Sequence, residues 1–377
     1  MKIAFFTDTY LPNRDGVVTA MLNFRRELEN KGHEVYVFSP GSRQAKKDNS
    51  DKRVFLYTST TFKPYPDYKI ALFPFFSSSK VKELGIDIIH SHGLATMGLA
   101  AYAASHSTNT PRVASFHTFV SEATHYISSI PAVKSITSKA TWKYLNWYYN
   151  LYPTITAPSA FASSILSQHQ ITSQVLANGI DTDRFNPAVS GDSFRKKHAI
   201  SGKTVFMHVG RVVLEKNIDL LIDSALIVRE DIPDAVFVIV GTGPALKYYQ
   251  ARVREKGLSR FFVFTGFVPD AELPQAYAAC DVFAFPSAFE TQGLVALEAM
   301  ACAKPVACLS DSAASELVEG YGCGVTFKNK ASDCAEQLVR AAKESKTLSR
   351  KARARALDFS NELCAAKLIK LYESVLR

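Results

Sequence analysis

Short apolar runs alternate with longer amphipathic segments along the chain, and the alternation occurs in two successive arrays. The first array contains KIAFFT, EVYVFSP, IDIIHSH, PRVASFHT and TITAPS, and the second contains KTVFMHVG, AVFVIVG, FFVFTG, DVFAFPS and KPVACLS. Short apolar runs that are followed by helical segments are typical of parallel strands with helices on both faces. The sequence therefore predicts an α/β protein with two Rossmann-like domains, each a doubly wound parallel sheet.

The joint between the two arrays is expected in the stretch ANGIDTDRFNP, where Gly179 and Pro187 interrupt regular structure. The last segment, ALDFSNELCAAKLIKLYESVL, has the pattern of one amphipathic helix, and no strand follows it. We expect one domain from residues 1–177 together with a C-terminal helix at 358–377, and a second domain from residues 178–357. Two such domains facing each other would leave a cleft that suits a reaction between two substrates.

Composition narrows the class of protein. No run reaches the roughly 18 to 20 apolar residues of a membrane span, and the start, MKIAFFTDTY, is too short and too soon acidic for a signal peptide. The six cysteines form no CxxC pair and no cluster with histidine, which fits reduced thiols better than disulfides or zinc. We therefore expect a cytoplasmic protein.

The net charge of +9 is concentrated in the first half of the chain. Residues 1–176 hold 18 Lys/Arg against 11 Asp/Glu, whereas the remainder holds 26 against 24. A basic first half suggests an anionic partner such as a phosphate or an acidic membrane surface, although charge alone fits an ordinary lysine-rich surface equally well. We expect no nucleic-acid partner.

Polar residues that follow the predicted strands of the second array are candidates for a binding site, because doubly wound sheets bind ligands beyond the carboxyl ends of their strands. Arg211 and Lys216 follow KTVFMHV and lie near the start of a helix, where two cations and free N–H groups suit a diphosphate. Taken alone, this pair would more often belong to a solvated surface.

A second group follows DVFAFPS, in the stretch SAFETQGLVALEAMACAKPVA. Glu290 precedes Thr291-Gln292-Gly293-Leu294, and Gly293 lets the backbone at a helix N-terminus approach a ligand closely. Glu298, about one turn inside that helix, could reach the vicinal hydroxyls of a ribose. A glutamate stabilised by the helix dipole is the simpler explanation of Glu298 alone.

Taken together, these residues resemble the retaining glycosyltransferases of family 4, which have the GT-B fold. The resemblance covers nearly the whole chain. It includes the opening TDTYLPNRDGVVTAMLNFRRELENKGHEVYVFSP, SFHTF, LANGIDTDRFNP, GRVVLEKNIDLLI, GTGP, FTGFVPDAELPQAYAACDVFAFPS and ETQGLVALEAMACAKPV. The seven-residue gap between Glu290 and Glu298 is weak evidence alone, but with the glycine, the cations and these motifs it becomes specific.

The resemblance implies roles for the second array. Glu290 would contact hydroxyls of the donor sugar with Thr291, Gln292, Gly293 and Leu294 beside it, and Glu298 would hold the ribose. Arg211 and Lys216 would bind the diphosphate, and Val268 would meet the nucleobase.

In the first array, the resemblance places Gly16, in a strand-to-helix loop, against the donor phosphates and His117 near the donor sugar. Glu122 and His125 are further candidates for the acceptor side, although a structural role fits His125 equally well. The family is thought to retain configuration by attack on the face from which the leaving group departs, with the leaving phosphate accepting the proton. We therefore assign no side-chain base, no metal and no cofactor, since the nucleoside diphosphate sugar is a substrate.

Three other motifs favour ordinary structural roles. Asp181-Thr182-Asp183 is a DxD string at the domain joint, where a turn is expected rather than a metal site. GTGPAL lacks the third glycine of a dinucleotide-binding loop and the acidic residue that should follow it. His90 and His92 alternate on a strand with no carboxylate or thiol near them in sequence, which favours hydrogen bonding over metal binding.

The acceptor is less defined than the donor. DTYLPNRDGVVTA and FHTFVSEATHYI are most similar to the membrane-associated diacylglycerol glucosyltransferases and phosphatidylinositol mannosyltransferases, although Asp15 and residues 93–96 depart from their usual pattern. A lipid acceptor is therefore expected, with UDP-glucose or GDP-mannose as the donor. An oligosaccharide acceptor, a sugar-nucleotide epimerase and a non-catalytic nucleotide-sugar binder remain as alternatives.

The segment AVKSITSKATWKYLNWYYNL predicts a helix that touches an anionic membrane through residues 132–151. No Asp or Glu occurs from Ala123 to Ile180. One stripe is expected to face the core, namely Val133, Ile136, Ala140, Tyr144, Trp147 and Leu151. Another is expected to be exposed, namely Lys139, Trp142, Lys143, Asn146 and Tyr149. Such a face would make the protein peripheral on the inner side of the cell membrane, unless Trp142 packs under a neighbouring loop and the lysines are merely solvated.

Overall fold

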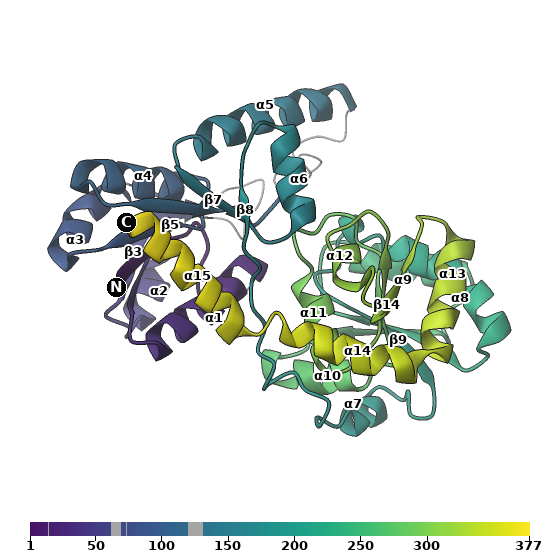
Figure 1. Cartoon of the computed structure of the whole chain (residues 1–377). Coiled ribbons are helices and arrows are strands. Elements are labelled where there is room, and N and C mark those ends of the chain that lie inside the picture. The colour runs from purple at the N-terminus through teal and green to yellow at the C-terminus, as the bar shows by residue number, and fades with distance from the viewer. Residues whose placement is uncertain (14, 62–68, 73, 120–130) are drawn as a thin grey trace. The chain divides into compact units, whose positions relative to one another are not determined.

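The structure is a computed structural model that describes residues 1–13, 15–61, 69–72, 74–119 and 131–377, without the side chains of 131–136. The chain forms two compact units, shown in Figure 1. The first comprises Met1–Gly179 with Asn361–Arg377, and the second comprises Ile180–Ser360. The boundaries fall two residues beyond the expected position 177 and three beyond the expected position 357.

The first unit is built on a sheet in which eight strands are described, in the order β4-β3-β2-β1-β5-β6-β7-β8. The described pairs are parallel except for β3 with β4. The strands are β1 (Lys2–Phe6), β2 (Glu34–Gly41), β3 (Val54–Thr61), β4 (Lys69–Ala71), β5 (Ile88–Ser91), β6 (Arg112–Ser115), β7 (Thr154–Ala157) and β8 (Gln174–Val175). The strand order reverses between β1 and β5, which is where a sheet of this kind offers a ligand crevice.

The helices of the first unit are α1 (Gly16–Asn30), α2 (Arg43–Asp48), η1 (Pro74–Phe76), α3 (Ser77–Leu84), α4 (Thr96–Thr108), α5 (Pro131–Tyr149), α6 (Ala160–Gln168) and α15 (Asn361–Leu376). Helix α1 begins where the Asp15 carboxylate accepts the Val18 N–H at 2.8 Å, an N-cap that satisfies one free donor of the first turn. The C-terminal helix α15, yellow in Figure 1, packs along α1 and thereby completes the first unit.

The second unit contains a parallel sheet in the order β11-β10-β9-β12-β13-β14. Its strands are β9 (Thr204–Val209), β10 (Ala235–Val240), β11 (Phe262–Gly266), β12 (Val282–Phe285), β13 (Val306–Leu309) and β14 (Gly324–Phe327). Its helices are α7 (Asp192–Lys197), η3 (Leu214–Lys216), α8 (Ile218–Asp231), α9 (Leu246–Glu255), η4 (Asp270–Glu272), α10 (Leu273–Ala278), α11 (Leu294–Ala301), α12 (Ser315–Val318), α13 (Ala331–Lys343) and α14 (Ser345–Leu357).

Both faces of the second sheet are buried, and strand β10 shows why its sequence is continuously apolar. Val236, Val238 and Val240 join the hydrophobic core on one face, and Phe237 and Ile239 join the core on the other. A strand covered by helices on both sides has no solvent face, so alternation of polar and apolar residues disappears. The prediction of a doubly wound α/β fold is confirmed in both units.

All ten apolar runs of the sequence form strands, and four further strands were not predicted. Three of these, β4, β8 and β14, occupy sheet edges, and the fourth, β3, pairs with the edge strand β4. The expected C-terminal helix at 358–377 is present as α15 and begins three residues later than expected, at Asn361. The chain leaves helical structure between α14 and α15, where Ser360 forms an isolated bridge with Ile180 at the end of the second unit.

Candidate functional site

The strongest candidate site lies at the carboxyl ends of β9 and β12 in the second unit, where the strand order reverses. Lys216, at the end of the short 3-10 turn η3 rather than in the helix itself, forms an ion pair with Glu290, which follows β12. Both side chains are about 20% exposed. The structure therefore brings together two predicted residues that are 74 positions apart in the chain.

This ion pair retains hydrogen-bonding capacity for a ligand. An ammonium group has three N–H donors and a carboxylate has two acceptor oxygens. One contact between Lys216 and Glu290 therefore leaves further donors on the lysine and a further acceptor oxygen on the glutamate. Arg211 is exposed in the turn that follows β9, on the same strand-to-helix connection as Lys216. The site can thus present cations to an anion and a carboxylate to hydroxyl groups.

Helix α11 begins beside this pair. Gly293, its N-cap, has φ of 87°, and a Cβ built there would lie 3.2 Å from the Phe285 ring, so the position favours glycine on both counts. No side chain of the described residues caps this N-terminus. Thr291 is partly buried and Gln292 is 3% exposed, while Leu294 packs on the core. Backbone N–H groups of the first turn are consequently suited to an anion.

Glu298 lies one turn inside α11, as predicted, and is held by a residue that the sequence did not single out. The Tyr277 hydroxyl donates a hydrogen bond of 2.7 Å to Glu298 Oε2. Burial raises the pKa of Glu298 to about 7, against the opposing effects of this hydrogen bond and of Arg184. A tyrosine on α10 gives no sequence signal for this role, because it also fits the buried face of an ordinary amphipathic helix.

Two buried polar atoms near the ends of β9 and β12 have no partner among the described residues, His208 Nε2 and Ser287 Oγ. Buried polar groups are nearly always hydrogen-bonded, so such atoms mark positions where water or a ligand group would be accommodated. Burial, with Lys216 contributing, lowers the pKa of His208 to about 4, so the imidazole is neutral at pH 7. The sequence reasoning missed both residues because they belong to apolar strand motifs.

The glycines of GTGPAL serve backbone packing. A Cβ at Gly241 would lie 1.9 Å from the Gly210 carbonyl oxygen, and one at Gly243 would lie 2.2 Å from that of Val212. Positions 241 and 243 must therefore be glycine for this loop to pack against the turn that carries Arg211. Val268, the predicted nucleobase contact, lies beyond β11 and is 8% exposed.

In the first unit, the Asp8 carboxylate after β1 accepts the backbone N–H groups of Ala95 at 2.7 Å and Met97 at 3.0 Å, at the start of α4. Gly93 allows this approach, since a Cβ there would lie 2.4 Å from Asp8 Oδ2. The expectation that Gly16 lies in the loop was wrong, because Gly16 is the first residue of α1 and follows the Asp15 N-cap.

Three histidines lie near the β5 and β6 strand ends. His117 Nε2 is 2.9 Å from His92 Nδ1, and the nitrogens of His90 contact the Tyr372 hydroxyl at 2.6 Å and Ser115 Oγ at 2.7 Å. Burial lowers the pKa of His117 to about 4 and that of His90 to about 3, so both are neutral at pH 7. The hydrogen-bonding interpretation of His90 and His92 is the one that the structure shows.

No group of three or more metal-ligating side chains is found in the described parts of the chain. The Asp181 carboxylate accepts the Arg184 N–H at 3.0 Å in a turn, as expected for the DxD string. Glu122 and His125 lie outside the described residues. The same ranges contain no helix with the length and apolarity needed to cross a membrane.

The predicted orientation of α5 was wrong in part. Lys139 and Lys143 are exposed as expected, and Tyr144 and Leu151 pack against the core as expected. The side chains of Val133 and Ile136 lie outside the described residues.

Leu145, Tyr148 and Tyr149 are buried, whereas Trp147, expected in the core, is 51% exposed. Aromatic residues at 142, 144, 147, 148 and 149 surround the helix, so their spacing did not fix which side faces inward. The tertiary partner decides, because the Tyr148 hydroxyl donates to the Gly93 carbonyl at 2.7 Å. The exposed stripe is Lys139, Lys143 and Trp147.

Comparison with known proteins gives consistent matches over both units. Residues 14–184 match the family described as Glycosyltransferase Family 4, and residues 190–358 match Glycosyl transferases group 1. The alpha-monoglucosyldiacylglycerol synthase of Acholeplasma laidlawii is 28% identical over 391 aligned positions, which cover 99% of this chain and 96% of that protein. A GDP-mannose-dependent alpha-mannosyltransferase of Mycobacterium tuberculosis is 27% identical over 387 positions, covering 100% and 97%.

Solved structures agree on the fold. Anabaena HepE in complex with UDP has a TM-score of 0.78 at 20% identity, with 99% of this chain and 100% of that chain covered. Sucrose-phosphate synthase from Thermosynechococcus elongatus has a TM-score of 0.77 at 18% identity, covering 99% and 98%. The chain therefore belongs to the family 4 glycosyltransferases with the GT-B fold, which confirms the resemblance carried by its motifs.

Proposed function

We propose that this hexosyltransferase moves a hexose from a nucleoside diphosphate sugar to a hydroxyl of a membrane lipid, such as diacylglycerol or a phospholipid headgroup, with retention of configuration. The observation that carries the proposal is the near full-length match to a monoglucosyldiacylglycerol synthase in a chain that pairs Lys216 with Glu290 beside α11. Related mannosyltransferases leave the choice between glucose and mannose to experiment.

The donor site follows from the charges at the β9 and β12 strand ends. As the glycosidic bond breaks, negative charge develops on the leaving diphosphate, and fixed cations and N–H groups stabilise it. Lys216, Arg211 and the N-terminus of α11 supply these groups, so the reaction requires no metal and no cofactor. The leaving phosphate then accepts the acceptor proton, and no side-chain base is assigned.

The remaining donor contacts follow the chemistry of each side chain. Glu290 accepts hydrogen bonds from sugar hydroxyls through the oxygen that Lys216 does not occupy, beside residues 291–294. Glu298, supported by Tyr277, accepts from the ribose hydroxyls, and Val268 packs on the base.

Gly16 and His117 are proposed as the contributions of the first unit to the donor phosphates and sugar. The His117 imidazole is neutral, which suits a hydrogen bond with an uncharged hydroxyl. The contact between His117 Nε2 and His92 orients this ring. Glu122 and His125 are proposed on the acceptor side.

Membrane attachment is proposed through the exposed stripe of α5, which keeps Lys139 and Lys143 of the expected face and has Trp147 as its aromatic residue. Lys139, Lys143 and Trp147 recur every four residues on one side of the helix, which suits the headgroup region of an anionic bilayer. Each lysine near such a surface contributes on the order of 1 kcal/mol, so binding is reversible and weakened by salt. The protein would then act as a peripheral enzyme on the inner face of the cell membrane.

A screen of labelled UDP- and GDP-sugars with and without vesicles containing diacylglycerol or phosphatidylinositol tests the proposal. We expect labelled lipid from one donor only when vesicles are present. Label transferred only to added oligosaccharides would establish the soluble-acceptor alternative, and conversion of the donor without an acceptor would establish an epimerase. Nucleotide-sugar binding without any product would indicate a non-catalytic binder.

A further inference from the structure

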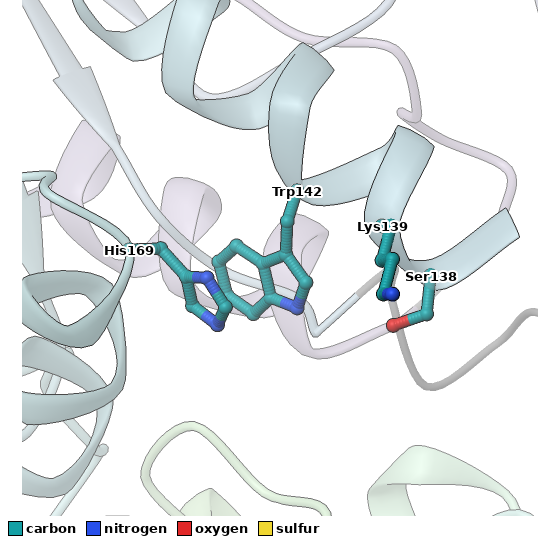
Figure 2. Close-up of a pocket in the computed structure, with 4 residues that line it drawn as sticks. All are labelled: Ser138, Lys139, Trp142 and His169. Atoms are coloured by element: carbon teal, nitrogen blue, oxygen red, sulfur yellow. The ribbon is translucent and has the colours of Figure 1, made fainter. Parts of the chain in front are cut away.

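A pocket of about 480 Å³ lies on the first unit. It is lined by Ser138, Lys139 and Trp142 of α5 and by His169, which ends α6 (Figure 2). The Trp142 and His169 rings are stacked, with centroids 3.6 Å apart and planes at 11°. Asn146 fixes this arrangement by donating to the His169 carbonyl at 2.8 Å. The aromatic wall of the pocket is therefore built by two elements and already ordered.

The polar side of the pocket is cationic. Figure 2 shows the Lys139 and Ser138 side chains at one side of the pocket and the stacked rings at the other. Lys139 is exposed and has no ion-pair partner in the parts of the chain that the structure describes. The chain from Ala123 to Ile180 contains no acidic residue. The Lys139 ammonium and the Ser138 hydroxyl can bind an anionic group, and the Trp142 ring beside them can pack against the carbon atoms of an organic anion.

Lys139 also belongs to the exposed stripe that continues through Lys143 to Trp147. Residues four apart on a helix share one face, so the pocket opens beside the surface that we assign to the membrane. A phosphate held in a bilayer would reach Lys139 together with its neighbours, whereas a free phosphate would gain nothing from Trp147. This continuity favours a lipid over a soluble anion.

We propose that this pocket binds the phosphate of an anionic phospholipid headgroup, with Lys139 and Ser138 donating to phosphate oxygens and Trp142 packing on the glycerol carbons. The proposal rests on the membrane attachment proposed above. It adds a specific headgroup site to a surface that would otherwise attract anionic lipids through charge alone.

The test compares three variants of the full chain on two kinds of phosphatidylcholine vesicle, one with phosphatidylglycerol and one with oleate at matched surface charge. Lys143→Ala is the matched control, since Lys143 lies on the same stripe but does not line the pocket. General attraction predicts about a fivefold loss of vesicle affinity for either lysine on either vesicle. The pocket predicts that Lys139→Ala loses at least twentyfold in affinity for the phosphatidylglycerol vesicles and only the general fivefold for the oleate vesicles.

Ser138→Ala removes a hydroxyl without changing charge, and we expect about a threefold to tenfold loss on phosphatidylglycerol and none on oleate. Trp142 emission, isolated in a Trp147→Phe background, should respond to phosphatidylglycerol vesicles and not to inorganic phosphate or glycerol phosphate. Equal losses for Lys139→Ala and Lys143→Ala, with Ser138→Ala unchanged, would overturn the pocket while leaving membrane attachment intact. Absence of vesicle binding by the wild-type protein would overturn both proposals, and an equal response of Trp142 to inorganic phosphate would overturn the lipid as the ligand.

Discussion

Replacement of Glu298 by glutamine should stabilise the protein at alkaline pH while weakening nucleotide binding. Glu298 is partly buried on α11, and burial raises its pKa from the usual 4.5 to about 7. The ionised carboxylate is therefore costly in the folded protein. Glutamine has nearly the same shape, carries no charge, and can still accept the hydrogen bond from Tyr277.

The magnitude follows from the linkage between proton binding and folding. Between pH 4.5 and about 7 the folded protein binds more protons at Glu298 than the unfolded chain, so the free energy of unfolding falls as pH rises and levels off above pH 7. At about 1.4 kcal/mol per pH unit, the full effect would be about 3 kcal/mol, and access of water reduces it to about 1 to 3 kcal/mol. The difference between Glu298→Gln and wild type should grow by this amount from pH 4.5 to pH 8.

Urea unfolding at half-unit pH steps measures this difference. Glu336→Gln, at an exposed position on α13, is the matched control for the removal of a carboxylate. In parallel, calorimetric titration should show about tenfold weaker binding of the donor nucleotide to Glu298→Gln, because a hydrogen bond to a charged acceptor is stronger than one to an amide. A stability difference that is flat across this pH range would refute the assignment of a costly buried carboxylate.

Three further outcomes are expected from the same geometry. Gly93→Ala should lower the free energy of unfolding by about 1 to 3 kcal/mol in thermal or urea unfolding, because its Cβ would lie 2.4 Å from Asp8 Oδ2 and 2.9 Å from the Asp8 backbone nitrogen. Gly16→Ala, with no atom within 4 Å of its Cβ in the described structure, should leave stability unchanged and reduce turnover, and unchanged turnover would argue against a phosphate at this position. EDTA should leave transfer rates unaltered, whereas activity that EDTA abolishes and Mg²⁺ or Mn²⁺ restores would show that Lys216 and Arg211 do not suffice for the leaving group.

The fold was largely predictable because each buried strand must be apolar on both faces, and this leaves a run in the sequence wherever helices cover a sheet. The strands at sheet edges lack that requirement. Val175, in the two-residue strand β8, is 56% exposed and gives no apolar signal. Three of the four edge strands, β4, β8 and β14, were therefore missed, together with β3 beside β4, whereas the edge strand β11 keeps an apolar run and was predicted.

The residues of the candidate site were predictable where chemistry and position coincide, as for Glu290 and Lys216 directly after strands. The residues that hold or surround these side chains were not predictable. Tyr277 and Glu298 form a hydrogen bond although they are 21 positions apart in the chain. His208 lies within the apolar strand TVFMHV, where its sequence context gives no sign of a binding role. The face of α5 was misassigned in part for the same reason, since the contact between Tyr148 and Gly93 spans 55 residues and decides which aromatic side chains are buried. Local periodicity carries no information on such partners.

The turnover of enzyme variants altered at Lys216 and Glu290 tests the central claim most directly. Initial rates of hexose transfer to lipid vesicles would be compared for wild type, Lys216→Ala, Glu290→Gln and the control Lys343→Ala, which breaks an exposed ion pair with Asp231 at 3.3 Å. We predict a loss of about 100-fold or more in turnover for each of the first two variants, with unfolding midpoints close to wild type, and no loss for the control. Near-normal turnover in folded Lys216→Ala and Glu290→Gln would contradict the assignment of this pair as the donor site.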